Sequence, residues 1–298
     1  MTNEINNILS PAMITSLLPQ YRISAEMEMR FINAMHHDDP IIERSLNNQG
    51  IKTIDNSELS TDTFDYFIKN KDALSNEFIS ELLRRVDRDE IDLFCEVVAE
   101  DWFDGMKKRN SGRPHNLKSS VYSYISRVYG DSWATSCVQR REPLNEVPPL
   151  ISENAIATIL TVNYQLLYKH IEEWKNQHPK GDFISNDDIF IRRGVSLATP
   201  IDKDNKYLEL DYISSYSLAI SAPEKFSQNG KNGSPAIING ELSLFNERIL
   251  FFSPFIPGMD SLQLEFGIIP SEKPLEIYDQ GEHGGIREYI LEPAPHQI

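Results

Sequence analysis

Cysteine is scarce in this sequence, which has only Cys95 and Cys137 among 298 residues. The two cysteines show no Cys-x-x-Cys spacing, which excludes a disulfide framework and a zinc knuckle and favours free thiols.

A basic segment followed by an apolar one is missing after Met1, and the first basic residue is Arg22. No apolar run reaches the roughly 18 residues that a membrane-spanning helix needs. Neither a Sec-type signal peptide nor a membrane span is therefore expected.

Positive charge is scarce as well, because 29 Lys and Arg residues stand against 45 Asp and Glu residues, a formal net charge of −16. Nucleic acid would meet net repulsion and is not expected as a partner. Residues 107–113, Lys-Lys-Arg-Asn-Ser-Gly-Arg, form a small basic loop. We expect a solvated connection there, with contact to a phosphate or an acidic partner as the alternative. Hydrophobic residues make up 40% of the chain, which is enough for a sizeable core.

The first 20 residues are polar and rich in Asn, Ser and Thr. This segment is similar to the leaders of bacterial type III secretion effectors, which implies secretion by a Sec-independent route into the cytoplasm of a target cell. A frayed terminus of a cytoplasmic protein is the alternative.

Residues 36–39, His-His-Asp-Asp, do not predict a metal site, because four adjacent residues of a regular element cannot converge on one ion.

Helical periodicity dominates the chain up to about residue 180. Residues 75–85 place Phe78, Ile79, Leu82 and Leu83 on one face, and residues 91–102 continue the same spacing. A third and longer helix is predicted from residue 152 to residue 174. Its apolar positions are Ile156, Ile159, Leu160, Val162, Leu166, Leu167 and Ile171. The helix should end before the Pro and Gly of residues 177–181.

After residue 181 the pattern changes to short strands, expected at 189–191, 207–213, 249–252, 262–269, 275–278 and 286–291. Residues 228–235 between them contain Gly, Asn and Pro, and predict a turn. The sequence thus predicts an α+β fold with a flexible leader (1–20), a helical region without a recognisable role (21–180) and a mostly antiparallel, β-rich module (181–298).

Three segments of this module carry candidate functional residues. The first, Phe190-Ile-Arg-Arg-Gly194, is a strand that ends in Arg and Gly. The second is the strand of residues 212–217, Tyr-Ile-Ser-Ser-Tyr-Ser, with a short helix at 222–226 after it. The third is the strand of residues 286–291, in which Glu288 lies between Ile286 and Ile290. A carboxylate in an apolar stripe is expected to be buried for a reason, and an edge strand with its polar side in water is the alternative.

In this order the segments resemble the Arg–Ser–Glu class of mono-ADP-ribosyltransferase toxins and effectors. Members of that class carry Arg-Gly at a strand end, an aromatic-x-Ser-Thr-Ser strand, a short helix with Ala and Phe, and a late Glu-hydrophobic-hydrophobic-Leu strand. The corresponding residues here are Arg193-Gly194, 212–216, 222–226 and 288–291. The resemblance covers residues 185–293, about a third of the chain.

The resemblance implies an enzyme that cleaves NAD⁺ and transfers ADP-ribose to a protein. Glu288 would offset the positive charge of the ribosyl cation left when nicotinamide departs. Arg193, with Gly194 beside it, would bind the diphosphate, and Ser214 would position the ribose and the glutamate strand. Further NAD⁺ contacts are expected from Ser215, Tyr216 and Phe226, with Tyr216 or Tyr212 stacked on the nicotinamide. NAD⁺ is then a co-substrate, and no metal is required.

Several positions depart from the family pattern and leave alternatives open. Ser215 and Tyr216 replace the Thr and the last Ser of the strand motif, and Ile286 stands where members carry Glu or Gln. Glu282 and His283 are the candidates to replace the carboxyl or amide group that is missing at position 286. The alternatives are an NAD⁺ glycohydrolase or a catalytically degenerate binding module.

The sequence also leaves open which arginine binds the diphosphate and which proteins are the partners. Arg192 is the alternative to Arg193, since adjacent strand residues face opposite sides. A protein of a host or competitor cell, and a secretion chaperone, are the partners that the resemblance implies.

Overall fold

The structure is a computed structural model and has an α+β fold, as the sequence predicts. It describes residues 62–102, 112–130, 144–177, 190–201, 206–207, 213–218, 221–228, 233–259, 261, 264–271, 275–283 and 285–293. The leader, the His-His-Asp-Asp segment and Tyr212 lie outside these residues.

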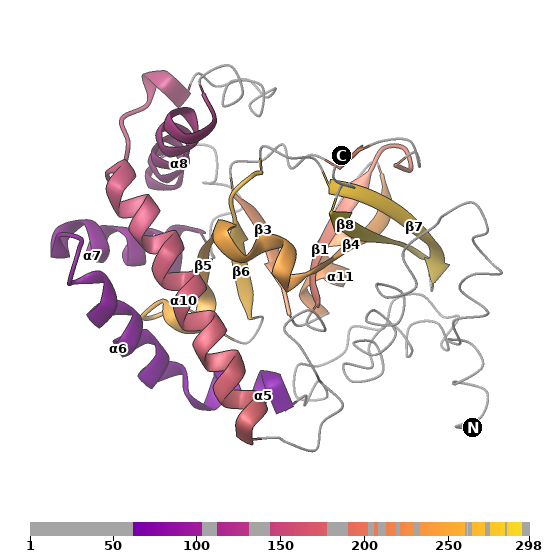
Figure 1. Cartoon of the computed structure of the whole chain (residues 1–298). Helices are drawn as coiled ribbons and strands as arrows, with labels where there is room; N and C mark the ends of the chain where they lie inside the picture. The colour runs from indigo at the N-terminus through magenta and orange to yellow at the C-terminus, as the bar shows by residue number, and fades with distance from the viewer. Residues whose placement is uncertain are drawn as a thin grey trace, which may run out of the picture.

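Helices form the first half of the described chain and lie beside one end of the sheet (Figure 1). They are α5 (Asp62–Lys69), α6 (Lys71–Leu82), α7 (Arg88–Glu96), α8 (Arg113–Tyr129) and α10 (Glu153–Gln177), with a π-helical turn, η2 (Val97–Trp102), after α7 and a 3₁₀ turn, η3 (Leu144–Glu146), before α10. Three of them confirm the predicted helices. Leu83 is exposed, because the buried stripe of α6 is formed by Leu74, Phe78 and Leu82, and Leu83 follows the end of the helix at the margin of that stripe.

Of the basic segment at residues 107–113, the first five residues lie outside the described part of the chain, and the last two stand at the start of α8, a helix that was not predicted from the sequence. Arg113 is the first residue of that helix. Its guanidinium lies 2.6 Å from Asp101 Oδ2 and 2.5 Å from Glu96 Oε1. These two acidic side chains come from η2 and α7, so Arg113 links α8 to the preceding helical segment of the same chain.

One mixed sheet forms the second half, in the order β2-β7-β8-β4-β1-β3-β6-β5. The strands are β1 (Phe190–Leu197), β2 (Lys206–Tyr207), β3 (Ser214–Ser217), β4 (Ser234–Glu241), β5 (Ile249–Phe252), β6 (Glu265–Ile268), β7 (Leu275–His283) and β8 (Ile286–Pro293). The helix α11 (Ser221–Gln228) follows β3, and two 3₁₀ turns flank β5, η5 (Leu242–Arg248) and η6 (Ser253–Phe255). Among the described strands only β4 and β8 pair in parallel.

The central strand β4 was not predicted, because Pro235 and Gly240 interrupt its apolar pattern. Pro235 is tolerated near the start of the strand, where the missing N–H matters least. Gly240 is required by packing, since a Cβ there would lie 2.5 Å from the ring of Phe245. The turn predicted at 228–235 is therefore wrong at its end, where the strand has already begun.

The helices and the sheet share one hydrophobic core. Phe67 of α5 contacts Phe252 of β5 with ring centroids 5.0 Å apart, and Phe78 of α6 stacks on Phe255 of η6 at 5.9 Å. Asn163 of α10 donates a hydrogen bond of 2.8 Å to the carbonyl oxygen of Leu250. Because β5 is an edge strand, this bond satisfies a backbone acceptor that the sheet leaves open.

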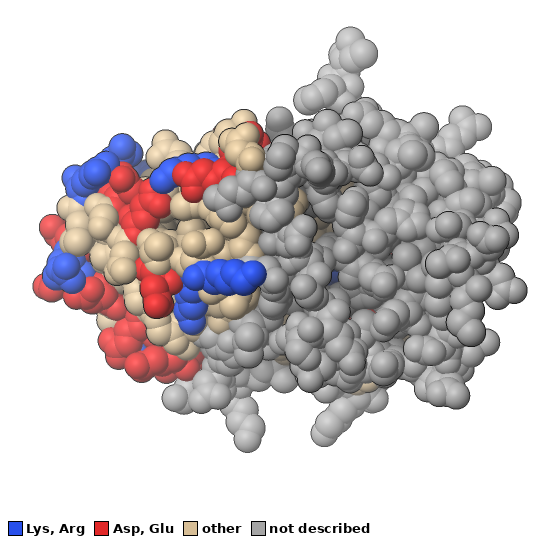
Figure 2. All heavy atoms as spheres, turned by 90° about the horizontal axis from the view of Figure 1, so that it is seen from below, with Lys and Arg blue, Asp and Glu red and all other residues tan. Residues whose placement is uncertain are grey.

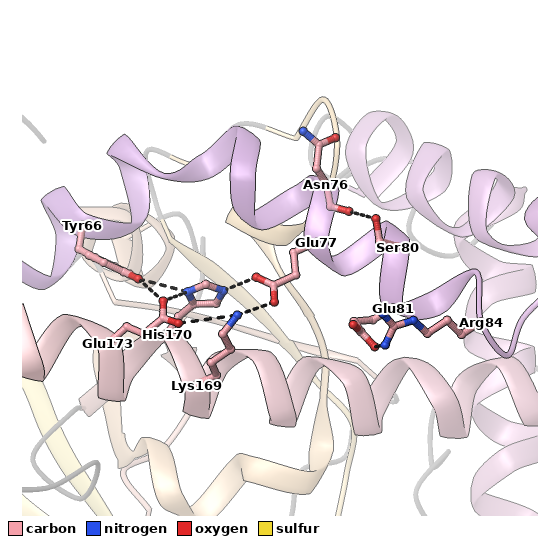
Figure 3. A network of polar contacts seen from close by, with 9 residues as sticks. All are labelled: Tyr66, Asn76, Glu77, Ser80, Glu81, Arg84, Lys169, His170 and Glu173. Atoms are coloured by element: carbon pink, nitrogen blue, oxygen red, sulfur yellow. Dashed lines mark hydrogen bonds and ion pairs between the residues drawn. The ribbon is translucent and has the colours of Figure 1, made fainter.

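A polar cluster connects α5, α6 and α10, with His170 at its centre (Figure 3). His170 Nε2 lies 2.9 Å from Glu77 Oε2, and its Nδ1 lies 3.1 Å from the hydroxyl of Tyr66 and from Glu173 Oε2. Lys169 Nζ donates to Glu77 Oε1 at 2.6 Å. The carboxylate of Glu77 on α6 therefore binds both Lys169 and His170 of α10.

Substitution of Glu77 by Gln is expected to reduce the pH dependence of stability. Burial alone would raise the pKa of Glu77, but hydrogen bonds from Lys169 and His170 lower the pKa below its ordinary value of 4.5. A carboxyl group whose pKa is lowered on folding stabilises above its unfolded pKa, and that stability is lost as the pH falls through the folded pKa.

Urea unfolding from pH 7 to pH 3 measures this effect. The wild-type protein should be more stable than Glu77→Gln by about 1 kcal/mol at pH 7, and the difference should shrink below pH 4.5. Glu81→Gln, which breaks an exposed pair of 2.7 Å with Arg84, is the matched control on the same helix. Parallel curves for Glu77→Gln and the wild type at every pH would contradict the prediction.

The described surface seen from below carries acidic and basic side chains interspersed with one another (Figure 2). None of the described helices is long and apolar enough to cross a membrane.

Candidate active site

β1 presents two consecutive arginines to opposite faces of the sheet. Arg192 pairs with Asn239 of β4 and with Ser217 of β3, whereas Arg193 pairs with Ile238 of β4. Because side chains alternate along a strand, paired residues share a face and neighbours in sequence do not. Arg192 is 0% exposed and donates to the carbonyl oxygen of Leu218 at 3.2 Å, while Arg193 is part-buried.

Arg193 and Ser214, two of the predicted site residues, are in direct contact. Arg193 Nη1 donates a hydrogen bond to the hydroxyl oxygen of the buried Ser214. Tyr216 faces the same side as Ser214, and its ring lies against Phe245 with centroids 4.9 Å apart. The ring of Tyr216 thus belongs to the core in this structure, which leaves it no free face for a nicotinamide.

Glu288 lies on β8, an interior strand between β7 and β4. Its side chain is 1% exposed, with Ile286 and Ile290 buried on the same face. The predicted burial is confirmed, and the alternative of a water-facing edge strand is wrong. Asn239 Nδ2 donates to Glu288 Oε2 at 2.8 Å, so the carboxylate has a defined hydrogen-bond donor.

Strand register places Glu288 on the face opposite Arg193 and Ser214. Glu288 pairs with Ile237 of β4 and Arg193 pairs with the next residue, Ile238, so the two side chains point in opposite directions. Ser214 is three residues from Ser217, which pairs with Arg192, and it therefore shares the face of Arg193. The three side chains singled out from the sequence do not converge on one side of the sheet.

A different set of the same residue types shares the face of Glu288. Arg192 of β1, Asn239 of β4 and Ser217 of β3 are paired across adjacent strands, and Ser215 faces the same side two residues before Ser217. Arg192 and Asn239 are fully buried, and Ser217 is nearly so. Arginine, serine and glutamate are therefore combined on this face, with Asn239 between the arginine and the glutamate.

The helix α11 packs on this face directly above Gly194. A Cβ on Gly194 would lie only 1.8 Å from the carbonyl oxygen of Pro223, so the helix backbone reaches the strand only because residue 194 is Gly. Glu224 and Ser227 of α11 are buried, and Phe226, a predicted NAD⁺ contact, is 38% exposed. Charged groups buried between a helix and a sheet are costly, and they are concentrated at functional sites.

Substitution of Gly194 by Ala is expected to displace α11 from the sheet. The new methyl group collides with backbone, which cannot rotate away as a side chain can, so overpacking should destabilise the protein by about 3 kcal/mol. Urea unfolding measures the loss, with Ser196→Ala on the same strand as the control, expected within about 0.5 kcal/mol of the wild type. An unchanged midpoint for Gly194→Ala would show that α11 does not approach β1 in this way.

Asp279 of β7 fixes the strand hairpin beside Glu288. Its carboxylate accepts a hydrogen bond of 2.8 Å from the N–H of Gly281 and also accepts from the guanidinium of Arg287. Gly281 pairs with Glu288, and the register of the two strands shifts between Asp279 and Gly281. Asp279 thus holds the irregular part of β7 that lies next to the glutamate.

Asn239 and Ser217 are not among the site residues that the sequence predicts. Asn239 follows Ile237 and Ile238, so a polar residue inside an apolar strand was a usable signal, but only once β4 itself was predicted. Glu282, a candidate substitute for the group missing at Ile286, is exposed on β7. Within the described residues no three His, Cys, Asp or Glu side chains are grouped so that they could hold a metal ion.

Comparison with known proteins gives a likeness to a solved structure and none to a family model. No protein-family model matches the sequence, and no curated protein matches it. Among solved structures the chain is similar to the crystal structure of the ADP-ribosyltransferase Vis in complex with M6 inhibitor, with a TM-score of 0.31 and 13% identity over 70% of this chain and 90% of that chain.

Proposed function

We propose that this chain is a mono-ADP-ribosyltransferase, which cleaves the nicotinamide–ribose bond of NAD⁺ and transfers ADP-ribose to a target protein. One observation carries the proposal: the buried Glu288 shares a face of four adjacent strands with Arg192 and with the hydroxyls of Ser215 and Ser217. Glu288 thus keeps the role that the sequence predicts. Arg192 takes the role expected of Arg193, and Ser215 and Ser217 take the role expected of Ser214.

Each side chain of this face has a role in the chemistry. When the C1′–N bond of NAD⁺ breaks, the electron pair leaves with nicotinamide and the ribose becomes cationic. The carboxylate of Glu288 offsets that charge as it develops, in surroundings of low polarity where the interaction is strong. The Arg192 guanidinium is a planar donor suited to the diphosphate, and the two serine hydroxyls position the ribose.

Access to this face requires a conformational change. Arg192 is 0% and Glu288 1% exposed, so NAD⁺ reaches them only if the segments on this face, α11 among them, move away from the sheet. Lids that close over a substrate exclude water, which here would strengthen the electrostatic interactions of Glu288 and Arg192 with the substrate.

Incubation of the full chain with labelled NAD⁺ and a lysate of candidate target cells tests the proposal. Release of nicotinamide together with labelled protein bands supports a transferase. The absence of both over a wide range of protein and NAD⁺ concentrations would overturn it. If NAD⁺ at millimolar concentration also fails to raise the melting temperature, the chain does not bind the dinucleotide at all.

An NAD⁺ glycohydrolase is the second candidate, and the surroundings of Glu288 favour it. The residue two positions before Glu288 is Ile286, which is buried and has no group able to orient a protein acceptor. Water would then be the acceptor of ADP-ribose. Free ADP-ribose without labelled protein, at every lysate concentration, decides for this candidate.

A further inference from the structure

Asn239 lies at the centre of the candidate active site, between Arg192 and Glu288. It is 0% exposed, it pairs with Arg192 across β1 and β4, and its Nδ2 donates to Glu288 Oε2 at 2.8 Å. The same Nδ2 donates to the backbone carbonyl oxygen of Tyr289 at 3.0 Å. Both donor positions of the amide nitrogen are therefore used within β8.

The orientation of this amide is fixed by its partners. Both neighbours on β8, the Glu288 carboxylate and the Tyr289 carbonyl, are acceptors, and a reversed amide would place oxygen against oxygen at both contacts. The carbonyl oxygen Oδ1 must then point away from β8, and there it is buried without a hydrogen-bond partner among the residues that the structure describes. A buried acceptor without a partner is unfavourable, and such groups in folded proteins call for an explanation.

We infer that Asn239 is a positioning residue for Glu288 and that its Oδ1 accepts a hydrogen bond from a ribose hydroxyl of the bound dinucleotide. This rests on the proposed function, because it places the same ribose beside Glu288. The amide then connects the substrate with the carboxylate: Nδ2 holds Glu288 in one rotamer, and Oδ1 gains in the complex the partner that it lacks in the free chain.

Kinetics of NAD⁺ cleavage by Asn239→Leu separate positioning from packing. We expect kcat to fall about 100-fold with a smaller change in KM, because the carboxylate is no longer held in place. In a Glu288→Gln background the same substitution should have little further effect, since residues that act together are not additive. Asn239→Asp, which is isosteric but lacks the donor, should also lose kcat. Asn239→Asp therefore still tests the positioning role if Asn239→Leu does not fold.

Analogues of NAD⁺ that lack one hydroxyl of the nicotinamide ribose test the Oδ1 contact. With the wild type, removing the bonded hydroxyl should lower kcat/KM by about tenfold, and with Asn239→Leu the same analogue should cost nothing more. Equal losses in both proteins for the 2′-deoxy and the 3′-deoxy analogue would overturn this contact. An unchanged kcat in both Asn239 variants would overturn the positioning role while leaving the proposed function in place.

A spectroscopic signature does not depend on turnover. The side-chain ¹⁵N–¹H signals of Asn239, assigned by their loss in Asn239→Asp, should shift in Glu288→Gln and again on addition of NAD⁺. If nicotinamide is not released and NAD⁺ leaves these signals unmoved, the proposed function and the ribose contact fail together. Signals that do not respond to Glu288→Gln would contradict the positioning role alone.

Discussion

Glu288→Gln is expected to lower the rate of NAD⁺ cleavage by about 1,000-fold without unfolding the protein. The substitution removes the negative charge that offsets the ribosyl cation, which is an interaction made mainly in the transition state. It keeps the shape of the side chain and an oxygen that can accept from Asn239 Nδ2, which lies 2.8 Å away in the wild type. The loss should therefore fall on kcat more than on KM.

Nicotinamide release and a urea unfolding curve on the same preparation measure the effect. Glu247→Gln is the matched control, because Glu247 is an exposed carboxylate of η5 to which no role in the site is assigned. The control should keep nearly full activity. A Glu288→Gln protein with more than about a tenth of the wild-type rate would exclude Glu288 as the catalytic carboxylate.

The second large effect is a contrast between two adjacent arginines. Arg192→Lys is expected to lower kcat/KM for NAD⁺ by about 100-fold, because an ammonium group cannot donate in the planar, bidentate geometry of a guanidinium. Arg193→Lys, on the opposite face, should change kcat/KM by less than about tenfold. The two variants keep the same net charge and lie on the same strand, so each is the control for the other.

This contrast decides which face of the sheet binds the dinucleotide. Arg193 contacts Ser214, and a larger loss for Arg193→Lys would move the site to their face and away from Glu288. Unfolding curves are needed for both variants, since Arg192 is buried and its guanidinium donates to the carbonyl of Leu218. A loss of activity in Arg192→Lys that exceeds any loss of folded protein supports the role in binding.

Local periodicity predicted most of the elements in this chain. The longest helix was predicted because its apolar residues recur every three to four positions, and α10 buries them against the sheet. β5 was predicted at Ile249–Phe252, where four apolar residues run together. β1 and β7 extend beyond their predicted ends, because their polar residues pair with neighbouring strands that a local pattern does not contain.

The amino-acid sequence by itself determined the α+β class, the change from helices to strands near residue 180 and the burial of Glu288, because these follow from apolar spacing along one segment. The tertiary structure alone decided that Glu288 shares its face with Arg192 and Asn239 and not with Arg193 and Ser214. The physical reason is that side chains alternate with a period of two, so a shift of one residue in strand pairing moves a side chain to the other face. That pairing is set by hydrogen bonds between strands far apart in the chain, and no local segment contains it.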